Sequence, residues 1–212
     1  MEALPFEPCQ RRKRPLAEAN MALSDEQLVA LTVKGDVTAF NEIVARWEGR
    51  LYNFVYRYLG DPEEAKDITQ ESFVRAYSHL DGFRGQSKFS SWLYQIALNL
   101  CRSKLRRHKA HPTVSIDDKE EDNSAWTLPD ERDTPDEHTL ARERALAVRE
   151  ALAQLPEAQR TVIILKEYNG LKFREIAEIL DTPESTVKSR LYHGLESLAQ
   201  ALGHLQAGGI QS

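Results

Sequence analysis

Apolar residues recur at helical spacing along most of this chain. The longest stripe runs over about five turns and consists of Phe40, Ile43, Val44, Trp47, Leu51, Phe54, Val55, Tyr58 and Leu59. A stripe of this period is typical of a helix that buries one face. Convincing alternation of apolar and polar residues is found nowhere in the sequence, so it predicts an all-α fold.

A second helix is predicted to begin directly after this stripe. Asp61 is a suitable N-cap, and Pro62 fits the first helical position. Its apolar side is formed by Ala65, Ile68, Phe73, Ala76, Tyr77 and Leu80. A glycine-containing basic loop, residues 81–88, separates it from a third helix. That helix is marked by Phe89, Trp92, Leu93, Ile96, Ala97 and Leu100.

The helix that begins at Pro62 carries a second stripe on its outer side. Asp67, Gln70, Glu71 and Val74 follow the spacing i, i+3, i+4 and i+7. Residues at this spacing lie on one face of a helix. The acidic and amide side chains indicate a surface that docks on a basic partner helix.

Residues 171–195, LKFREIAEILDTPESTVKSRLYHGL, are predicted to form two helices joined by a turn at Asp181–Pro183. We expect Thr182 to be the N-cap of the second helix and Pro183 to lie in its first turn. Val187, Leu191, Gly194, Leu195, Leu198 and Leu202 line one side of that helix.

The opposite side of this helix is short, basic and rich in hydrogen-bonding groups. It carries Ser185, Thr186, Lys188, Ser189, Arg190, Tyr192 and His193. The major groove of DNA admits one helix, and such side chains can read base edges and phosphates. An ordinary helical hairpin with a solvated polar face would show the same pattern, so this segment alone leaves both interpretations open.

The net charge of −5 is unevenly distributed along the 212 residues. Residues 108–138 carry −7, whereas residues 75–107 carry +6, a local excess suited to a phosphate backbone. The acidic segment contains three prolines and few aliphatic residues, which is typical of a linker. We therefore expect a tail (1–22), a helical domain (23–107), a flexible linker (108–138), a second helical domain (139–205) and a short C-terminal tail (206–212).

Several classes of protein are disfavoured by the sequence. The basic residues 11–14 are followed by no apolar run, so we expect neither a signal peptide nor membrane insertion. Cys9 and Cys101 are too few for a disulfide framework or a zinc site, and Cys101 is expected in the core. The sequence has no phosphate-binding glycine loop and no nucleophile with an obvious base, so we expect no enzyme, metal site or cofactor.

Several of these motifs together resemble the extracytoplasmic-function subfamily of bacterial sigma factors, within the sigma-70 superfamily. The resemblance rests on residues 67–71 (DITQE), 82–85 (GFRG), Phe89, Trp92–Leu93, Leu155–Pro156 and the helix-turn-helix, in that order. It covers nearly all of both predicted domains.

The resemblance implies a subunit that binds core RNA polymerase and directs it to promoters in the cytoplasm, in an envelope or other stress response. Asp67, Gln70, Glu71 and Val74 would dock on the clamp helices of the largest subunit, and the second domain would meet the flap. An anti-sigma factor is a further implied partner.

The resemblance also assigns the two promoter-reading surfaces. Minus-ten recognition would fall on Phe83, Arg84, Gln86, Ser87, Lys88, Phe89, Trp92, Asn99, Arg102 and Lys104. Minus-thirty-five recognition would fall on the outer face of the last helix, where many relatives are richer in arginine than this chain.

A stand-alone helix-turn-helix regulator and a helical adaptor that binds polymerase are the alternatives to a sigma factor. Selective binding of duplex DNA by the free chain would favour the regulator.

Overall fold

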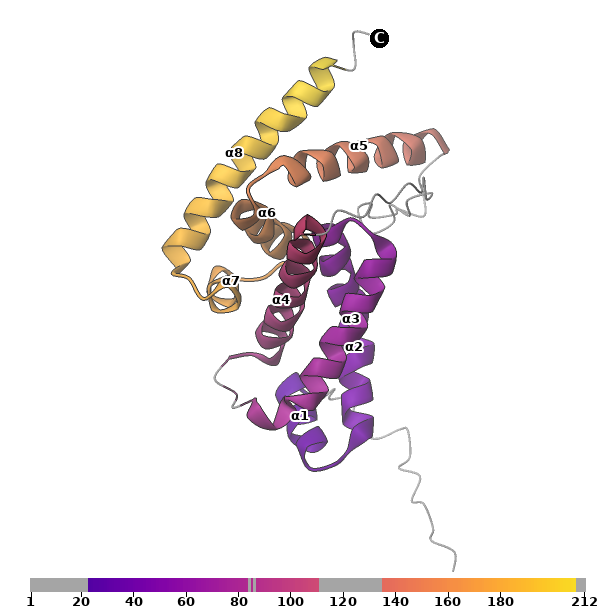
Figure 1. The fold of residues 1–212 in the computed structure, drawn as a ribbon, viewed down its shortest axis with the longest axis vertical. Coiled ribbons are helices and arrows are strands. Elements are labelled where there is room, and N and C mark those ends of the chain that lie inside the picture. The colour runs from indigo at the N-terminus through magenta and orange to yellow at the C-terminus, as the bar shows by residue number, and fades with distance from the viewer. Residues whose placement is uncertain (1–22, 84, 86, 111–134, 209–212) are drawn as a thin grey trace, which may run out of the picture.

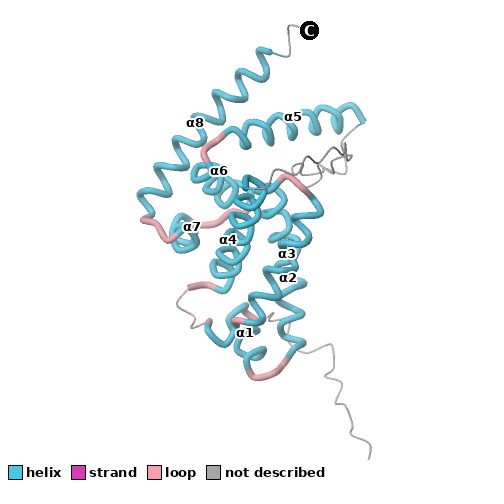
Figure 2. Tube along the Cα trace, in the orientation of Figure 1, coloured by secondary structure: helices cyan, strands magenta, loops and turns pink. Residues whose placement is uncertain are grey.

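The computed structural model describes residues 23–83, 85, 87–110 and 135–208, and side chains for all of these except 109, 135–143 and 204–208. All regular structure within these ranges is helical, which confirms the all-α prediction for the described residues (Figures 1 and 2). The elements are α1 (Asp25–Val33), α2 (Val37–Leu59), α3 (Pro62–Ser78), η1 (Leu80–Gly82), α4 (Phe89–Ala110), α5 (Pro135–Gln154), α6 (Glu157–Ile163), η3 (Ile164–Tyr168), α7 (Phe173–Leu180) and α8 (Glu184–Gly208). None of the described helices is both long and apolar enough to cross a membrane.

Local capping explains where the N-terminal helices begin and end. The Asp61 carboxylate accepts a hydrogen bond from the Glu64 N–H at 2.8 Å, and Pro62 opens α3, as predicted. Gly60 ends α2 in the left-handed conformation (φ 83°), which favours glycine. Ser24 and Gln27 form a reciprocal capping box at the start of α1. The sequence analysis did not identify α1, although this capping pattern is visible in the sequence.

The N-terminal helices share one aromatic core. The rings of Phe54 and Tyr94 meet edge to face at a centroid distance of 5.2 Å, and Trp47 contacts Tyr94 in the same way at 6.1 Å. The predicted stripe of α2 is buried except for Val44 and Leu59, which are half-buried. Burial of this stripe against α1, α3 and α4 stabilises the unit, because apolar burial contributes roughly 25 cal/mol per Å².

Cys101 lies in this core on α4 and is completely buried, as the sequence predicted. Burial raises the pKa of its thiol to about 12. Since the thiolate is the nucleophile, the thiol will be almost inert at pH 8. In a Cys9→Ser variant, we expect iodoacetamide to label native Cys101 at least ~100-fold more slowly than the urea-unfolded chain. Equal rates in the two states would show that α4 does not bury this side chain.

The C-terminal helices pack closely where α8 crosses α6. A Cβ atom placed on Gly194 would lie 3.0 Å from Ile163 Cδ1 and 3.1 Å from Gln159 Cβ. Glycine therefore allows the two helices to approach, and Val187 and Leu191 are buried on the same side of α8. The apolar side predicted for this helix is thus confirmed in its first half. Further along it, Leu195 is exposed and Leu198 is half-buried.

This contact gives a prediction about stability. A Gly194→Val substitution will lower the free energy of unfolding by about 1–3 kcal/mol, because the added methyl groups overpack the α6–α8 contact. Gly203→Val is the matched control, since nothing lies within 4 Å of a Cβ atom at Gly203 in the same helix. Urea denaturation of both variants measures the difference. Equal stabilities would mean that the helices do not pack as closely as the structure shows.

The helix-turn-helix turn differs from the prediction in one detail. The Pro183 carbonyl accepts hydrogen bonds from the Thr186 and Val187 N–H groups, so α8 begins at Glu184 and Pro183 occupies the cap position. Thr182 is therefore not the N-cap. Its N–H instead donates to the Ala177 carbonyl and ends α7, while Asp181 turns the chain in the left-handed region (φ 46°).

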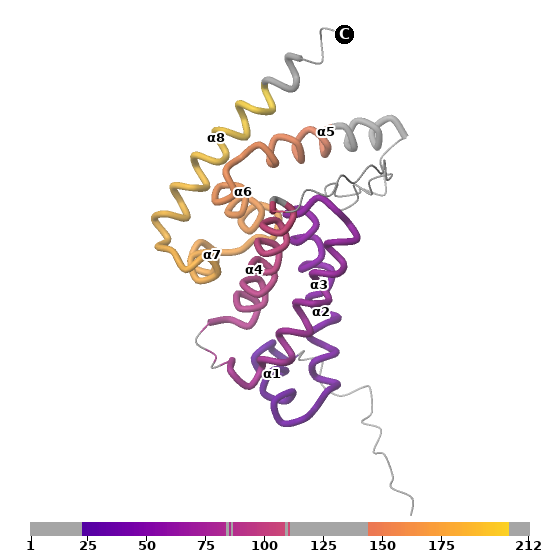
Figure 3. Tube along the Cα trace, in the orientation of Figure 1, coloured from indigo at the N-terminus to yellow at the C-terminus, as the bar shows by residue number. Residues whose placement is uncertain are grey.

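Helices α1–α4 and α5–α8 form two groups that lie against each other (Figure 3). The contact is made by α4 with α7 and by α2 with η3. The guanidinium of Arg57 on α2 lies 4.5 Å from the ring centroid of Tyr168 in η3. Helix α4 extends to Ala110 and α5 starts at Pro135, so both ends of the segment 108–138 are helical, and its acidic run 117–122 lies outside the described residues.

Candidate nucleic-acid and polymerase interfaces

The outer face of α8 is open to solvent. Val187 and Leu191 point into the C-terminal core, which leaves the predicted reading side chains on the other side. Ser185, Lys188, Ser189, Tyr192 and His193 are exposed, and Thr186 and Arg190 are half-buried. The Lys188 ammonium lies 5.5 Å from the ring centroid of Phe173, which positions one cation of this face on α7. The arrangement can offer hydroxyls and cations to a groove.

The outer stripe of α3 is also accessible. Asp67 and Gln70 are exposed, Glu71 is half-buried, and Val74 is 64% exposed. The Glu71 carboxylate is held by an ion pair with Arg75 one turn later, at 2.6 Å. This helical face therefore presents carboxylate, amide and apolar side chains together to solvent.

The loop before α4 is supported by three aromatic rings. Phe89 is fully buried and makes an edge contact with Phe83 (5.9 Å), while Phe83 also lies 5.1 Å from Trp92. Phe83 and Trp92 are half-buried. Arg84 and Gln86 lie outside the described residues. Phe89 is thus the buried member of this cluster, and Phe83 and Trp92 are its partly exposed members.

Two of the predicted DNA-contacting groups on α4 already have carboxylate partners. Arg102 Nε donates to Glu157 Oε1 at 2.9 Å, and Lys104 Nζ lies 3.2 Å from Glu64 Oε1. Asn99 is exposed on the same helix. Glu64 belongs to the neighbouring helix α3, whereas Glu157 belongs to α6 of the C-terminal group.

A third cation, Lys88, also contacts the C-terminal group. Its ammonium donates to the Glu175 carboxylate on α7 at 2.6 Å. Glu175 is itself held by the Lys172 N–H at 2.8 Å. Sequence reasoning missed Glu157 and Glu175, because no local pattern links residues that are 55 and 87 positions away from their partners.

Two tyrosines of the N-terminal helices donate hydrogen bonds to the C-terminal helices. Tyr58 donates its hydroxyl to Glu157 at 2.9 Å, and Tyr94 donates to Asn169 at 2.9 Å. Burial raises the pKa of Tyr58 to about 12, so this donor keeps its proton at neutral pH.

The electrostatics of the two carboxylates follow from these partners. Partial burial raises the pKa of Glu157, but hydrogen bonds from Tyr58 and Arg102 outweigh it, and the pKa is lowered overall. The pKa of Glu175 is likewise lowered overall, because the hydrogen bonds from Lys88 and Lys172 outweigh the effect of its burial. Both carboxylates are therefore charged at neutral pH.

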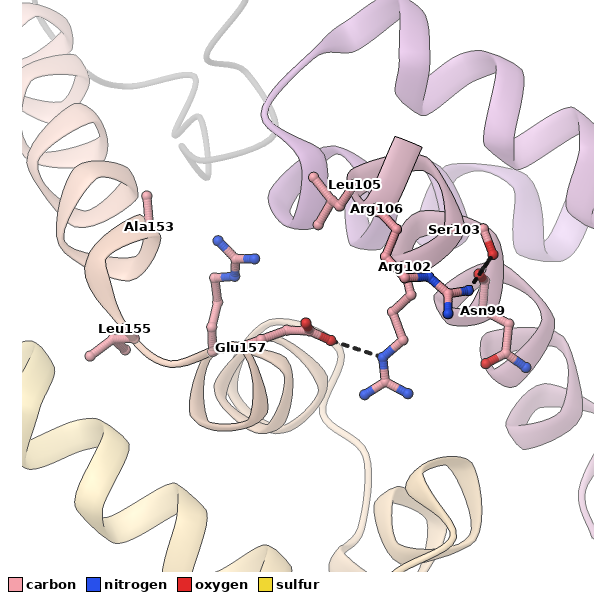
Figure 4. A pocket seen from close by; sticks show the side chains of 9 residues that line it. Asn99, Arg102, Ser103, Leu105, Arg106, Ala153, Leu155 and Glu157 are labelled. Carbon is pink, nitrogen blue, oxygen red and sulfur yellow. Dashed lines mark hydrogen bonds and ion pairs between the residues drawn. The ribbon is translucent and has the colours of Figure 1, made fainter. Parts of the chain in front are cut away.

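A cavity of about 650 Å³ lies between α4 and the α5–α6 corner. Figure 4 shows Arg102 on α4 reaching Glu157 through an ion pair that crosses the gap, whereas the Arg106 guanidinium turns to the Ser103 hydroxyl of its own helix at 3.2 Å. The side chains of Leu155 and Ala153 line the opposite wall. At this place the two groups of helices are joined by polar contacts around an opening, while their buried apolar residues belong to one hydrophobic cluster.

Two family models match the chain. Sigma-70 region 2 matches residues 43–111, and sigma-70 region 4 matches residues 145–198. The first match covers α3, the aromatic cluster and α4, and the second covers the helix-turn-helix.

Curated relatives match over most of their length. The RNA polymerase sigma-H factor of Pseudomonas aeruginosa is 34% identical, over 84% of this chain and 93% of the relative. The ECF RNA polymerase sigma factor SigW of Bacillus subtilis is 37% identical, over 81% and 93%. The ECF RNA polymerase sigma-E factor of Escherichia coli is 37% identical, over 83% and 93%.

Solved structures show the same fold. CnrH, solved in complex with the cytosolic domain of CnrY, aligns with a TM-score of 0.64 at 25% identity, over 85% of this chain and 97% of CnrH. The sigma factor RpoE of Bartonella quintana, solved in complex with the anti-sigma factor NepR, aligns with a TM-score of 0.61 at 22% identity, over 79% and 98%.

Proposed function

Because the chain belongs to the extracytoplasmic-function sigma factors of RNA polymerase, we propose that three separate surfaces carry out its promoter-specific initiation. A sigma factor binds core RNA polymerase and directs it to promoters. The observation that supports this division of labour is that the α3 stripe, the aromatic cluster and the outer face of α8 are all accessible on different elements. We assign the N-terminal domain to residues 23–107 and the C-terminal domain to residues 139–205.

The α3 stripe is the proposed docking surface for core polymerase. Asp67, Gln70, Glu71 and Val74 provide two carboxylates, one amide and one apolar contact. The partner surface would be a basic helical element, the clamp helices of the largest subunit, with the C-terminal domain at the flap. Catalysis belongs to the polymerase, so the chain itself acts as a binding subunit, in the cytoplasm where the polymerase works.

The aromatic cluster and α4 are the proposed minus-ten surface. A base removed from the DNA stack can be held by stacking on an aromatic ring, which is worth about 1–3 kcal/mol per base. Phe83 and Trp92 are the available rings, backed by Phe89. Asn99, Arg102 and Lys104, with Ser87 and Lys88 at the start of the helix, would hold the adjacent backbone, and Arg84 and Gln86 belong to the same proposed surface.

The outer face of α8 is the proposed minus-thirty-five surface. Lys188 and Arg190 supply positive charge, and the serine and threonine hydroxyls supply donors and acceptors for base edges. The two promoter elements are about 25 base pairs apart, or ~85 Å along B-form DNA. The segment 111–134 can span at most roughly 80 Å when fully extended, so the covalent connection permits the domains to separate by a comparable distance.

An anti-sigma factor is the proposed regulator. CnrH was solved with the cytosolic domain of CnrY and the Bartonella quintana RpoE with the anti-sigma factor NepR, and this chain shares their fold. An envelope or other stress response is the proposed setting.

The proposed function is tested by mapping transcript 5′ ends. Purified core polymerase would transcribe sheared genomic DNA with and without this chain. We expect new start sites that appear only with the chain and share two sequence elements near positions −10 and −35. Identical start sites in both reactions would contradict the proposed function.

A further inference from the structure

Two carboxylates of the C-terminal domain hold cations that the N-terminal domain needs for DNA. Glu175 contacts Lys88 at 2.6 Å, and Glu157 contacts Arg102 at 2.9 Å. Both cations belong to the proposed minus-ten surface. In each pair, a carboxylate oxygen occupies a position beside the cation that a phosphate oxygen would take on DNA.

The arrangement with these contacts intact cannot read a promoter. Lys88 of the minus-ten surface touches α7, the helix that packs against α8 of the minus-thirty-five surface. On a promoter the two surfaces must lie ~85 Å apart. The contacts between α4 and α7, and between α2 and η3, must therefore break before both elements are bound.

We propose that Glu157 and Glu175 are intramolecular DNA mimics that keep the minus-ten surface occupied until core polymerase separates the two domains. This inference rests on the proposed function of Lys88 and Arg102. Only the minus-ten surface is masked in this way, because the outer face of α8 stays open in the same arrangement.

Each of the two carboxylates is held in position by a hydrogen-bond donor of its own in addition to the cation. Glu157 accepts a second hydrogen bond from the Tyr58 hydroxyl, and Glu175 accepts one from the Lys172 N–H. These extra donors fix each carboxylate before its cation arrives. Glu175 has only 14% of its side chain exposed, whereas its partner Lys88 is 60% exposed. The Glu175 carboxylate is thus fixed in the C-terminal domain, and the exposed Lys88 ammonium can leave it to bind a DNA phosphate.

The same contact is weak enough to be reversible. Arg102 and Glu157 are 37% and 49% exposed, and ion pairs with this access to solvent contribute little and are screened by salt. The cavity of about 650 Å³ beside them shows that α4 and the α5–α6 corner are not fully packed at this pair, although α4 stays in contact with α7. Binding of both domains to polymerase can therefore open the arrangement.

The test uses the full-length chain without polymerase. The probe is a fluorescein-labelled single-stranded DNA of 15 nucleotides that carries a minus-ten element from a mapped start site. A Glu157→Gln/Glu175→Gln variant removes both charges while amide oxygens remain as hydrogen-bond acceptors. Fluorescence anisotropy at low salt should show about 5- to 10-fold tighter binding than the unmodified chain, because Lys88 and Arg102 are released.

Glu150→Gln/Glu196→Gln is the matched control. It removes two acidic charges from exposed positions of the same domain, on α5 and α8, and neither residue forms the ion pairs of Lys88 or Arg102. We expect the control to change the affinity less than 2-fold. Equal gains in the two variants would overturn the proposal, because net charge alone would then explain the effect.

Small-angle X-ray scattering provides the second readout. The Glu157→Gln/Glu175→Gln variant should have a larger radius of gyration than the control at equal helix content by circular dichroism. Tighter DNA binding without expansion would also overturn the proposal. If the unmodified chain fails to support initiation with core polymerase, it is the proposed function that fails, so the two failures are distinguishable.

Discussion

Replacing Lys188 and Arg190 with alanine will reduce promoter-specific initiation on the order of 30-fold, because each lost DNA contact is worth about 1–3 kcal/mol. Both side chains lie on the outer half of α8, while Val187 and Leu191 hold the helix from the other side. The fold and core binding should be unchanged. Run-off transcription at limiting protein measures the loss, and gel filtration with core polymerase measures binding.

The control for this pair is Lys34→Ala/Arg144→Ala. Both residues are exposed, and neither belongs to a proposed interface. This variant removes the same charge and should initiate within 2-fold of the unmodified chain. If the Lys188 and Arg190 variant also initiates at full level, the minus-thirty-five surface has been assigned to the wrong face.

Replacing Gln70 and Glu71 with alanine will weaken binding to core polymerase by roughly 10-fold or more. The two side chains lie at the centre of the exposed α3 stripe, where interface residues carry most of the binding energy. The fold will be retained, since the Glu71–Arg75 ion pair joins side chains that are 43% and 53% exposed, and such pairs stabilise by at most about 1 kcal/mol. Biolayer interferometry with immobilised core polymerase measures the affinity.

Asn41→Ala/Glu48→Ala is the matched control for core binding. It removes one amide and one carboxylate from exposed positions on α2. We expect its affinity for core polymerase to be unchanged, and its circular dichroism to match that of the Gln70 and Glu71 variant. A loss of affinity that is equal in both variants would remove the α3 stripe from the docking surface.

The helices with strong periodicity could be predicted from the sequence. The stripe from Phe40 to Leu59 became α2, and the Asp61–Pro62 start of α3 appeared at the predicted residues, because capping and burial are set by neighbours in the chain. Helix α1 was missed since it is only 9 residues long and lacks an extended stripe. Thr182 was misplaced as a cap because its N–H bonds back to the Ala177 carbonyl of α7, and the first carbonyl to accept from α8 is that of Pro183.

The candidate surfaces were predictable to the extent that they lie on a single element. The outer faces of α3 and α8 follow from helical spacing alone. The partners of Lys88 and Arg102 do not, because they depend on how two domains pack, and the sequence showed only an excess of positive charge in residues 75–107. A local charge count cannot reveal that carboxylates from distant helices already neutralise part of that excess.

Footprinting on one mapped promoter is the most direct test of the central claim, that the two domains read separate elements of one promoter while bound to polymerase. Hydroxyl-radical cleavage would be compared for the free chain, core polymerase and their mixture. We predict protection near both −10 and −35 only in the mixture, with the −35 protection lost in the Lys188 and Arg190 variant. Protection of a single continuous site by the free chain, unchanged by polymerase, would contradict the account and identify a stand-alone DNA-binding regulator.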